Sequence, residues 1–437
     1  MRKDPTSTTD AGRTTSARWF GRWLLIPLVI GAALRIAPTA AHLPEVRHPD
    51  EPINFDVLHQ MVAHRTGVPR VFWYPTTFYY VHIAAQLPAA LLARATGRVD
   101  ALADYGRSSN QWAGNAKVEH RSAMLLGRLV NVLAGLALIA ATAWTAHQAT
   151  RDRRVVLLSA WLAAISPLLV IDAGRFTPDT LSGLVATLAV GTALRVGRRP
   201  DVWSYGLAGV AIGIAFTTKY NAALCGIVLV VMWLTDHRRT ARQAAVAAGS
   251  ALLAAIVVMP TIIVTPDAVI GGLRFNVDHY RTGHAGNEGN SWTFNLWWIV
   301  RNLGLFGLVA PLGPLLRRQR ETIALGVYAA SGYVVLSTPS VRFERNILPV
   351  LPAVIVLSAV ATVALGVRWK AHPFARRAVE VAAAASMVLM LVLSLAAVAR
   401  AVDDHDHRAV DEYVASRLPQ GGTVQVEAYS PELHVPQ

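Results

Sequence analysis

The chain has 437 residues, of which 53% are hydrophobic and only 16% are charged. A soluble domain carries about 25% charged residues, so this composition excludes an ordinary soluble protein and indicates a membrane protein. The net charge of +14 would suit nucleic acid, but the basic residues form short clusters between apolar runs, as in membrane loops, and we expect no nucleic-acid partner. The single cysteine, Cys225, excludes an internal disulfide and is interpreted as a core residue.

The apolar runs predict an all-α polytopic membrane protein with about 11 transmembrane helices. Residues 1–18 are rich in Ser, Thr and Arg and are expected to form a disordered cytoplasmic tail. The run 19–41 is too long for an ordinary signal peptide, so it predicts the first spanning helix. The further runs are 122–147, 154–173, 179–197, 203–217, 220–235, 243–264, 293–316, 322–338, 346–367 and 377–399.

Segment 74–96 is apolar, but it is not expected to cross the membrane. If it stays on the outer side, every dense basic cluster falls on the side of the N-terminus, which the positive-inside rule identifies as the cytoplasm. Its tyrosines, prolines and histidine also suit an interfacial helix. The sequence therefore predicts a large outer loop at 42–121 with two membrane-parallel helices, near 53–65 and 76–94.

The first polar feature of this loop is the tetrapeptide His48-Pro49-Asp50-Glu51. Pro49 and Pro52 restrict the backbone around two adjacent carboxylates, between a spanning and an interfacial helix. Ionisable residues are costly next to hydrocarbon and are often functional, so we interpret Asp50 and Glu51 as catalytic candidates. The alternative is an acidic helix N-cap, which needs only one carboxylate.

Other unusual polar residues fall on the predicted outer side. The candidate substrate-binding residues are Arg128, Asp179, Lys219, His279, Tyr280, Arg342 and Arg345. A lone arginine beside hydrocarbon either reaches the headgroups or binds an anion, and several on one side favour an anionic ligand. Asp179 also suits an ordinary helix start, and His279 and His284 also suit a solvated loop.

A divalent metal ion is the one possible cofactor, and its candidate ligands are Glu51, His48 and His279.

The outer side of a membrane lacks ATP and nucleotide sugars, so a transfer reaction there needs a donor carried by the membrane. A sugar linked to polyprenyl phosphate meets this requirement. Cationic side chains would stabilise its phosphate leaving group, and a carboxylate would accept the proton of the acceptor hydroxyl.

In the order of these residues along the sequence, the chain resembles the GT-C membrane glycosyltransferases, specifically the bacterial branch of family 39 protein O-mannosyltransferases and lipid A aminoarabinose transferases. The likeness runs from about residue 19 to the C-terminus. The matching segments are His48-Pro49-Asp50-Glu51, residues 74–80, Gly127-Arg128-Leu129, Arg175 to Asp179, Lys219-Tyr220 and Arg342-Phe343-Glu344-Arg345-Asn346.

The resemblance implies a GT-C catalytic domain over 19–400 in the plasma membrane, with its active site on the outer face. It implies inverting transfer from a polyprenyl-phosphate sugar to a hydroxyl of a protein, lipid or cell-envelope glycan. Asp50 would be the base, and Glu51 would orient the acceptor or support a metal. The phosphate ligands would be Arg128, Arg342 and Arg345, with Lys219 a weaker candidate.

The chain departs from this family at 75–77, where Pro-Thr-Thr brings no basic residue to the phosphate. Residues 401–437 resemble the start of an outer-face domain, cut short, with a helix, a turn and a strand. A transporter or flippase of a lipid-linked substrate is the competing interpretation, but the sequence has no inverted repeat and its charges gather at one surface. A non-catalytic scaffold is the third interpretation, and the retention of Asp50 and the arginines argues against it.

Overall fold

In this computed structural model the chain is described over residues 9–41, 43, 48–107, 120–283, 286–403, 412–413 and 416–417. Within those ranges the chain forms helices and no β-strand, apart from one bridge between Glu288 and Val341. The all-α prediction is therefore confirmed. Nearly all of the predicted tail 401–437, and the loop residue His284, lie outside the described residues.

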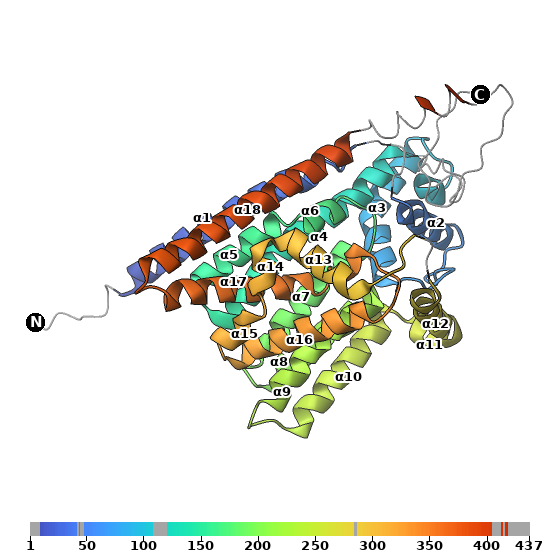
Figure 1. Cartoon of the computed structure of the whole chain (residues 1–437). Coiled ribbons are helices and arrows are strands. Elements are labelled where there is room, and N and C mark those ends of the chain that lie inside the picture. Colours follow the sequence, from blue (N-terminus) through green and yellow to red (C-terminus); the bar gives the residue numbers. More distant parts are fainter. Residues whose placement is uncertain are drawn as a thin grey trace, which may run out of the picture.

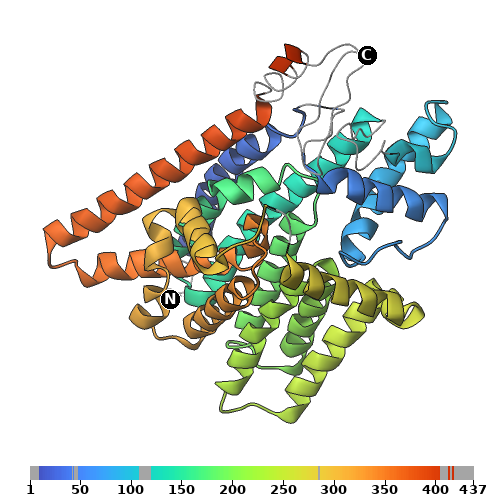
Figure 2. The same ribbon diagram turned by 45° about the vertical axis from the view of Figure 1, so that its right-hand side comes forward.

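Most helices lie lengthwise in one bundle (Figure 1). Figure 2 shows α1 and α18 along one edge of this bundle and α8 to α10 along another. The bundle helices are α1 (Thr9–Ile36), α4 (Arg121–Thr150), α5 (Arg153–Ala164), α6 (Pro167–Asp172), α7 (Asp179–Arg195), α8 (Val202–Thr218), η2 (Tyr220–Cys225), α9 (Gly226–Leu234), α10 (Ala241–Val258), α13 (Ser291–Leu303), α14 (Leu305–Val309), α15 (Leu312–Leu316), α16 (Arg320–Ser337), η3 (Glu344–Ile347), α17 (Leu351–Arg368) and α18 (Pro373–Val402).

Several apolar runs that the sequence predicts as single helices are divided. The run 154–173 breaks into α5 and α6 before Pro167, and the run 293–316 breaks into three helices at Gly304 and Pro311. Proline removes a helical hydrogen bond, and Gly304 has a positive φ of 56°. Helix α1 begins at Thr9, earlier than expected, since no proline occurs between residues 9 and 26.

Four of the described helices are long and apolar enough to cross a membrane by length and composition: α4, α10, α17 and α18. Three shorter apolar segments are Trp23–Ile36, Val202–Thr218 and Tyr220–Leu234. The chain is therefore a membrane protein with several apolar helices, and the count of eleven stays a prediction.

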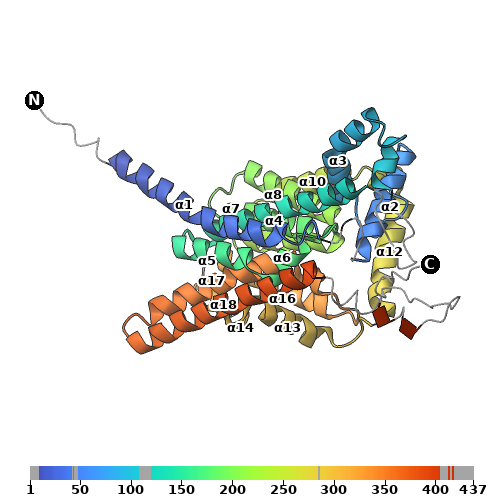
Figure 3. The ribbon, with the colours of Figure 1, turned by 90° about the horizontal axis from the view of Figure 1, so that it is seen from above.

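Four elements lie across one end of the bundle (Figure 3). They are α2 (Asp50–Ala63), α3 (Thr77–Ala95), α11 (Thr261–Val264) and α12 (Pro266–Thr282), and the short η1 (Leu102–Gly106) packs against α2 and α3. The bounds of α2 and α3 agree closely with those of the two helices expected at 53–65 and 76–94, and their position along the membrane surface stays a prediction. The Thr77 hydroxyl donates to the Thr217 hydroxyl over 2.9 Å, which attaches the start of α3 to the end of α8.

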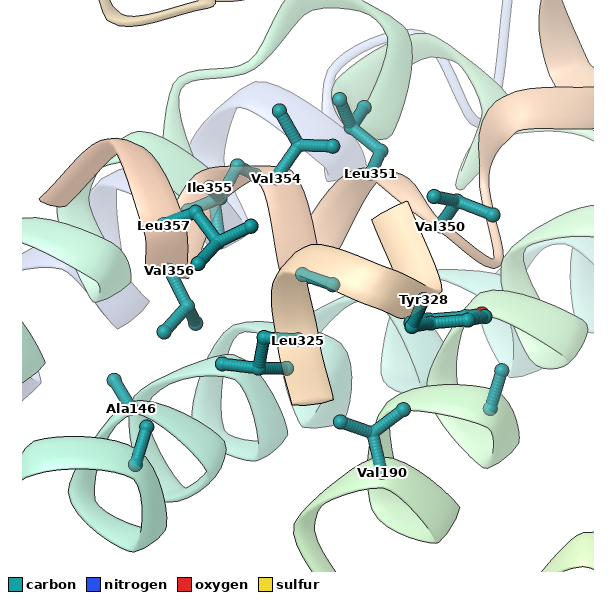
Figure 4. Close-up of a cluster of buried hydrophobic side chains, with 14 of the residues drawn as sticks. Ala146, Val190, Leu325, Tyr328, Val350, Leu351, Val354, Ile355, Val356 and Leu357 are labelled. Atoms are coloured by element: carbon teal, nitrogen blue, oxygen red, sulfur yellow. The ribbon is translucent and has the colours of Figure 1, made fainter. Parts of the chain in front are cut away.

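The apolar core lies between α4, α7, α16 and α17, as Figure 4 shows around Tyr328, Val190 and Val354. The Tyr328 hydroxyl meets its hydrogen-bonding need inside this core by donating to the Pro349 carbonyl at 2.9 Å. This bond fixes the chain just before α17. The core thereby holds the preceding η3, which carries Arg345, at the same end of the bundle as α2.

The topology is tested with cysteine substitutions in a Cys225→Ala background. Thr96 and Arg153 are both exposed, at the end of α3 and the start of α5. We expect Thr96→Cys to react with a membrane-impermeant maleimide in intact cells, and Arg153→Cys to react only after the membrane is opened. Labelling of both from the same side would contradict the placement of 74–96 along the outer surface.

Candidate functional site

Asp50 and Glu51 both begin α2, but their carboxylates have different surroundings. Glu51 is fully buried. Its Oε1 accepts hydrogen bonds from Arg128 Nε at 3.0 Å and from the Phe176 backbone N–H at 2.7 Å, and its Oε2 accepts from Arg128 Nη2 at 2.8 Å. A two-point arginine–carboxylate pair of this kind fixes geometry as well as charge. Glu51 thus joins α2 to α4 and to the segment before α7.

Arg128 directs all three of its nitrogens at protein groups. Besides the Glu51 carboxylate, its Nη1 donates to the carbonyls of Thr39 and Ala41 at 3.2 and 3.3 Å. The side chain is only 8% exposed. The expected role of Arg128 in phosphate binding stays a prediction, and this geometry favours a positioning role instead.

The segment from Arg175 to Pro178 is held through its backbone. Asn54 of α2 donates to the Phe176 carbonyl at 3.1 Å, and Asn131 of α4 donates to the Thr177 carbonyl at 2.8 Å. The Phe176 ring stacks on Phe55 with centroids 4.0 Å apart. These contacts set the position of Asp179 at the start of α7. Neither asparagine stands out in the sequence, because its partner is a backbone group far along the chain.

Asp50 is less buried than Glu51, since its side chain is 14% exposed. Its Oδ2 accepts a hydrogen bond from the Tyr74 hydroxyl at 3.1 Å and lies 2.9 Å from Arg345 Nη2. Burial and the Asp50 charge raise the pKa of Tyr74 well above its usual value, so the phenol stays protonated and donates. The sequence suggested only an interfacial place for Tyr74.

Arg345 is the centre of this cluster. Its Nε lies 3.9 Å from Asp179 Oδ2, its Nη1 lies 3.1 Å from His48 Nε2, and its guanidinium packs on the Phe343 ring. Burial is the largest single influence and opposes its charge, but Asp50 together with Asp179 and the other groups nearby more than offsets burial, so the pKa of Arg345 is raised. Burial, together with the charges of Arg175 and Arg345, holds the pKa of His48 well below its usual value, so the imidazole is neutral.

A second cation lies on the other side of Asp179. Lys219 Nζ pairs with Asp179 Oδ1 and donates to Asn346 Oδ1 at 3.3 Å. The Asn346 amide in turn donates to the Tyr280 hydroxyl at 2.9 Å. The structure therefore brings Asp179, Lys219 and Tyr280 together with Arg345, as expected from the sequence. Asn346 links them, and it was noted only as part of a motif.

Two further charged residues belong to this region. Asp172, at the end of α6, is fully buried and accepts a hydrogen bond from the Thr180 hydroxyl at 2.7 Å, while its Oδ1 has no partner in the described part of the chain. Arg175 is partly exposed, and its charge acts on Asp172 and His48. An aspartate inside an apolar run is a signal that could have identified Asp172 from the sequence.

Arg342 lies apart from Arg345. Phe343 between them is extended, with φ −130° and ψ 133°, so the two arginines do not lie on one helical turn. The Arg342 guanidinium lies over the Phe294 ring at 5.1 Å, toward α13. Its role as a phosphate ligand stays a prediction.

The expected metal ligands are not gathered into a metal site. Glu51 contacts Arg128, His48 faces Arg345, and the His279 ring stacks on Phe275 with centroids 5.8 Å apart. Over the described residues, no group of three or more His, Cys, Asp or Glu side chains is placed to hold a metal ion. The metal set of His48, Glu51 and His279 therefore does not form in this geometry.

Comparison with known proteins places this geometry in context. Residues 117–264 match the family of dolichyl-phosphate-mannose-protein mannosyltransferases. The structure superposes on ArnT from Cupriavidus metallidurans bound to undecaprenyl phosphate with a TM-score of 0.64, at 17% identity over 94% of this chain and 84% of that one. The chain has the GT-C fold. The GT-C fold expected from the resemblance is therefore confirmed.

Two other structures share this fold. The oligosaccharyltransferase of Archaeoglobus fulgidus matches with a TM-score of 0.58 and 14% identity, over 95% of this chain and 61% of that chain. The arabinosyltransferase EmbB of Mycobacterium smegmatis matches with a TM-score of 0.52 and 11% identity, over 92% of this chain and 42% of that one. No curated protein matches the chain.

The Glu51–Arg128 pair is tested by Glu51→Gln, which leaves the buried Arg128 charge uncompensated. Breaking a buried ion pair costs about 3–5 kcal/mol, so we expect a clear fall in the melting temperature of the purified protein. The matched control is Asp56→Asn on the same helix. Asp56 pairs at 3.5 Å with Arg70, whose side chain is 58% exposed, and such a pair contributes at most about 1 kcal/mol. Equal effects of both variants would contradict the anchoring role.

Proposed function

We propose that this protein is a membrane glycosyltransferase that transfers a sugar from a polyprenyl-phosphate donor to an acceptor hydroxyl on the outer membrane face. The observation that carries the proposal is the cluster in which the partly exposed Asp50, at the start of α2, lies beside Arg345 and close to the Asp179–Lys219 pair. A carboxylate base next to a set of cations is the arrangement that this chemistry needs.

The reaction proposed is a single inverting displacement. The acceptor oxygen attacks the anomeric carbon from the face opposite the phosphate, and Asp50 takes the hydroxyl proton. The bond between the anomeric carbon and the phosphate oxygen breaks, its electron pair stays on that oxygen, and polyprenyl phosphate departs as the leaving group. Negative charge therefore grows on the phosphate as the transition state forms, and cations stabilise it there.

The cations nearest to Asp50 take the phosphate in this proposal. Arg345 contacts Asp50 and Lys219 contacts Asp179, so both charges already stand in the cluster. Arg175 adds a partly exposed guanidinium whose side chain makes no ion pair among the described residues. When the phosphate arrives, Arg345 exchanges part of its contact with Asp50 for the phosphate oxygens, which frees the base.

Known proteins of this fold support the chemical class of the donor. One is bound to undecaprenyl phosphate, and the archaeal oligosaccharyltransferase has been seen with a dolichol phosphate and an inhibitory peptide. The acceptor in this proposal is a hydroxyl of a protein, lipid or envelope glycan. Glu51 and Arg128 act as positioning residues in this proposal, because each is engaged with the other.

The base is tested with Asp50→Asn in a deletion strain. Mass spectrometry of membrane lipids, wall glycans and exported proteins identifies the glycosylated species that the deletion removes. We expect the native gene to restore it and Asp50→Asn, at equal expression, to restore about 10²–10⁴-fold less per unit time. Asp56→Asn is the control and should restore it fully. Restoration by Asp50→Asn at the native rate would refute the assignment of the base.

The phosphate site is tested by comparing Arg345→Lys with Arg342→Lys. Lysine keeps the charge but loses the planar fork that binds phosphate oxygens in pairs. We expect Arg345→Lys to lower turnover about 10- to 100-fold, since charge-assisted hydrogen bonds contribute about 1.5–3 kcal/mol each. If Arg342 also binds phosphate, its lysine variant loses turnover as well, whereas an anchor over Phe294 does not. Full activity of Arg345→Lys would contradict this phosphate site.

A further inference from the structure

An apolar groove lies at the end of the bundle opposite the candidate site. It has a volume of about 280 Å³ and lies between α1, α4 and α5. Its lining includes Leu24, Leu28, Ala140, Ala143, Trp144 and Ala160. Along the axis of α4, Ala143 is about 22 Å from Arg128 at 1.5 Å per residue, so the groove is separate from the site.

Small side chains create this groove. Ala143 and Ala160 are buried and form its floor, whereas Ala140 is exposed at its opening. Pockets for drug-sized ligands have volumes of about 300–1,000 Å³, so this groove suits a single hydrocarbon chain better than a bulky group. Because α1, α4 and α5 belong to the bundle of a membrane protein, lipid chains are the apolar molecules available to fill it.

The groove ends at His147, where arginines gather. Arg198 Nη2 donates to the His147 carbonyl at 2.9 Å, and its Nη1 donates to the Gln148 side chain at 3.0 Å. Arg151 follows α4, and its backbone N–H donates to the same carbonyl at 3.2 Å. Neither arginine forms an ion pair with the residues that the structure describes.

The carboxylates near this end do not cancel its positive charge. Asp152 is shared by Arg154 at 3.0 Å and Arg317 at 3.7 Å. Glu321 is the second carboxylate near this end, and its charge acts on Arg198. Two carboxylates thus face four arginines (Arg151, Arg154, Arg198 and Arg317), which leaves an excess of positive charge beside the groove. Arg151 is exposed and Arg198 is partly exposed. An apolar groove that opens beside these two arginines matches the two parts of an anionic lipid.

We propose that this groove binds one acyl chain of an anionic phospholipid, whose phosphate lies against Arg151 and Arg198. The acyl chain would replace the side-chain volume missing at the alanines, and the arginines would attract the anionic headgroup. The lipid would join α1 to α4 and α5. This inference does not depend on the proposed transfer reaction.

Native mass spectrometry of the delipidated full-length protein in detergent tests the proposal. The probes are palmitoyl-oleoyl phosphatidylglycerol and the phosphatidylcholine with the same chains. We expect one phosphatidylglycerol to bind about 5- to 25-fold more tightly than phosphatidylcholine, from the contribution of two arginines. Arg151→Asn should reduce this preference about fivefold. Asparagine tolerates the positive φ of 54° at this position, so the fold is retained.

Variants that block the groove distinguish lipid binding in the groove from lipid binding elsewhere on the protein. Ala140→Phe should lower phosphatidylglycerol binding at least about tenfold, and the smaller Ala140→Leu should lower it in the same direction. Ala248→Phe, at an exposed position of α10, is the matched control and should bind as the native protein does. Equal binding by the Ala140 and Ala248 variants, or equal binding of the two lipids by the native protein, would overturn the proposal. Displacement of phosphatidylglycerol by undecaprenyl phosphate would also overturn it.

Discussion

The buried pair between Glu51 and Arg128 is the interaction on which the site depends. Two charges removed from water are costly, and a pair of this kind persists only when both groups are fully hydrogen-bonded. That condition is met, since Glu51 also accepts from the Phe176 N–H and Arg128 also donates to the carbonyls of Thr39 and Ala41. Four segments are thereby joined at one point: the end of α1, the start of α2, α4 and the turn before α7.

Around this anchor the site alternates negative and positive groups. Asp50 and Asp179 are both close to Arg345, and Lys219 compensates Asp179 from the other side. In a partly buried cluster each charge is stabilised by its neighbours rather than by water. A bound phosphate would enter such a cluster by taking over contacts now made by the carboxylates, which couples donor binding to release of the base in the proposed mechanism.

The breaks in the bundle helices are stabilised by side chains. Between α5 and α6 the fully buried Arg35 donates to the carbonyls of Ala163 and Ala164 at 2.9 Å, and Asn302 accepts from the Leu168 N–H at 2.7 Å. Irregular backbone inside a membrane protein requires such partners, because no water is available to satisfy it. Helix α6 begins after this break and ends at Asp172, whose carboxylate accepts a hydrogen bond from Thr180 of α7.

The sequence by itself determined that the chain is a helical membrane protein, the approximate bounds of α2 and α3, and most members of the charged cluster around Arg345. Composition and apolar run length specify a polytopic helical protein, because burial in lipid depends on local hydropathy. The restricted turn at Pro49 and the motifs around Arg175, Lys219 and Arg345 identified a set of charged residues, since each is unusual beside apolar sequence. The resemblance indicated the GT-C fold, which the structure has.

Only the tertiary structure decided which partner each charged residue of that set contacts. Asp50 and Glu51 are neighbours in sequence, yet one faces the cluster and the other is buried against Arg128. Local sequence cannot distinguish them, because the partner of Glu51 lies on α4 and that of Asp50 on η3. Arg342 and Arg345 differ likewise, since an extended Phe343 turns the first toward α13. The roles of charged groups follow from pairing across the fold, and pairing is a property of packed helices.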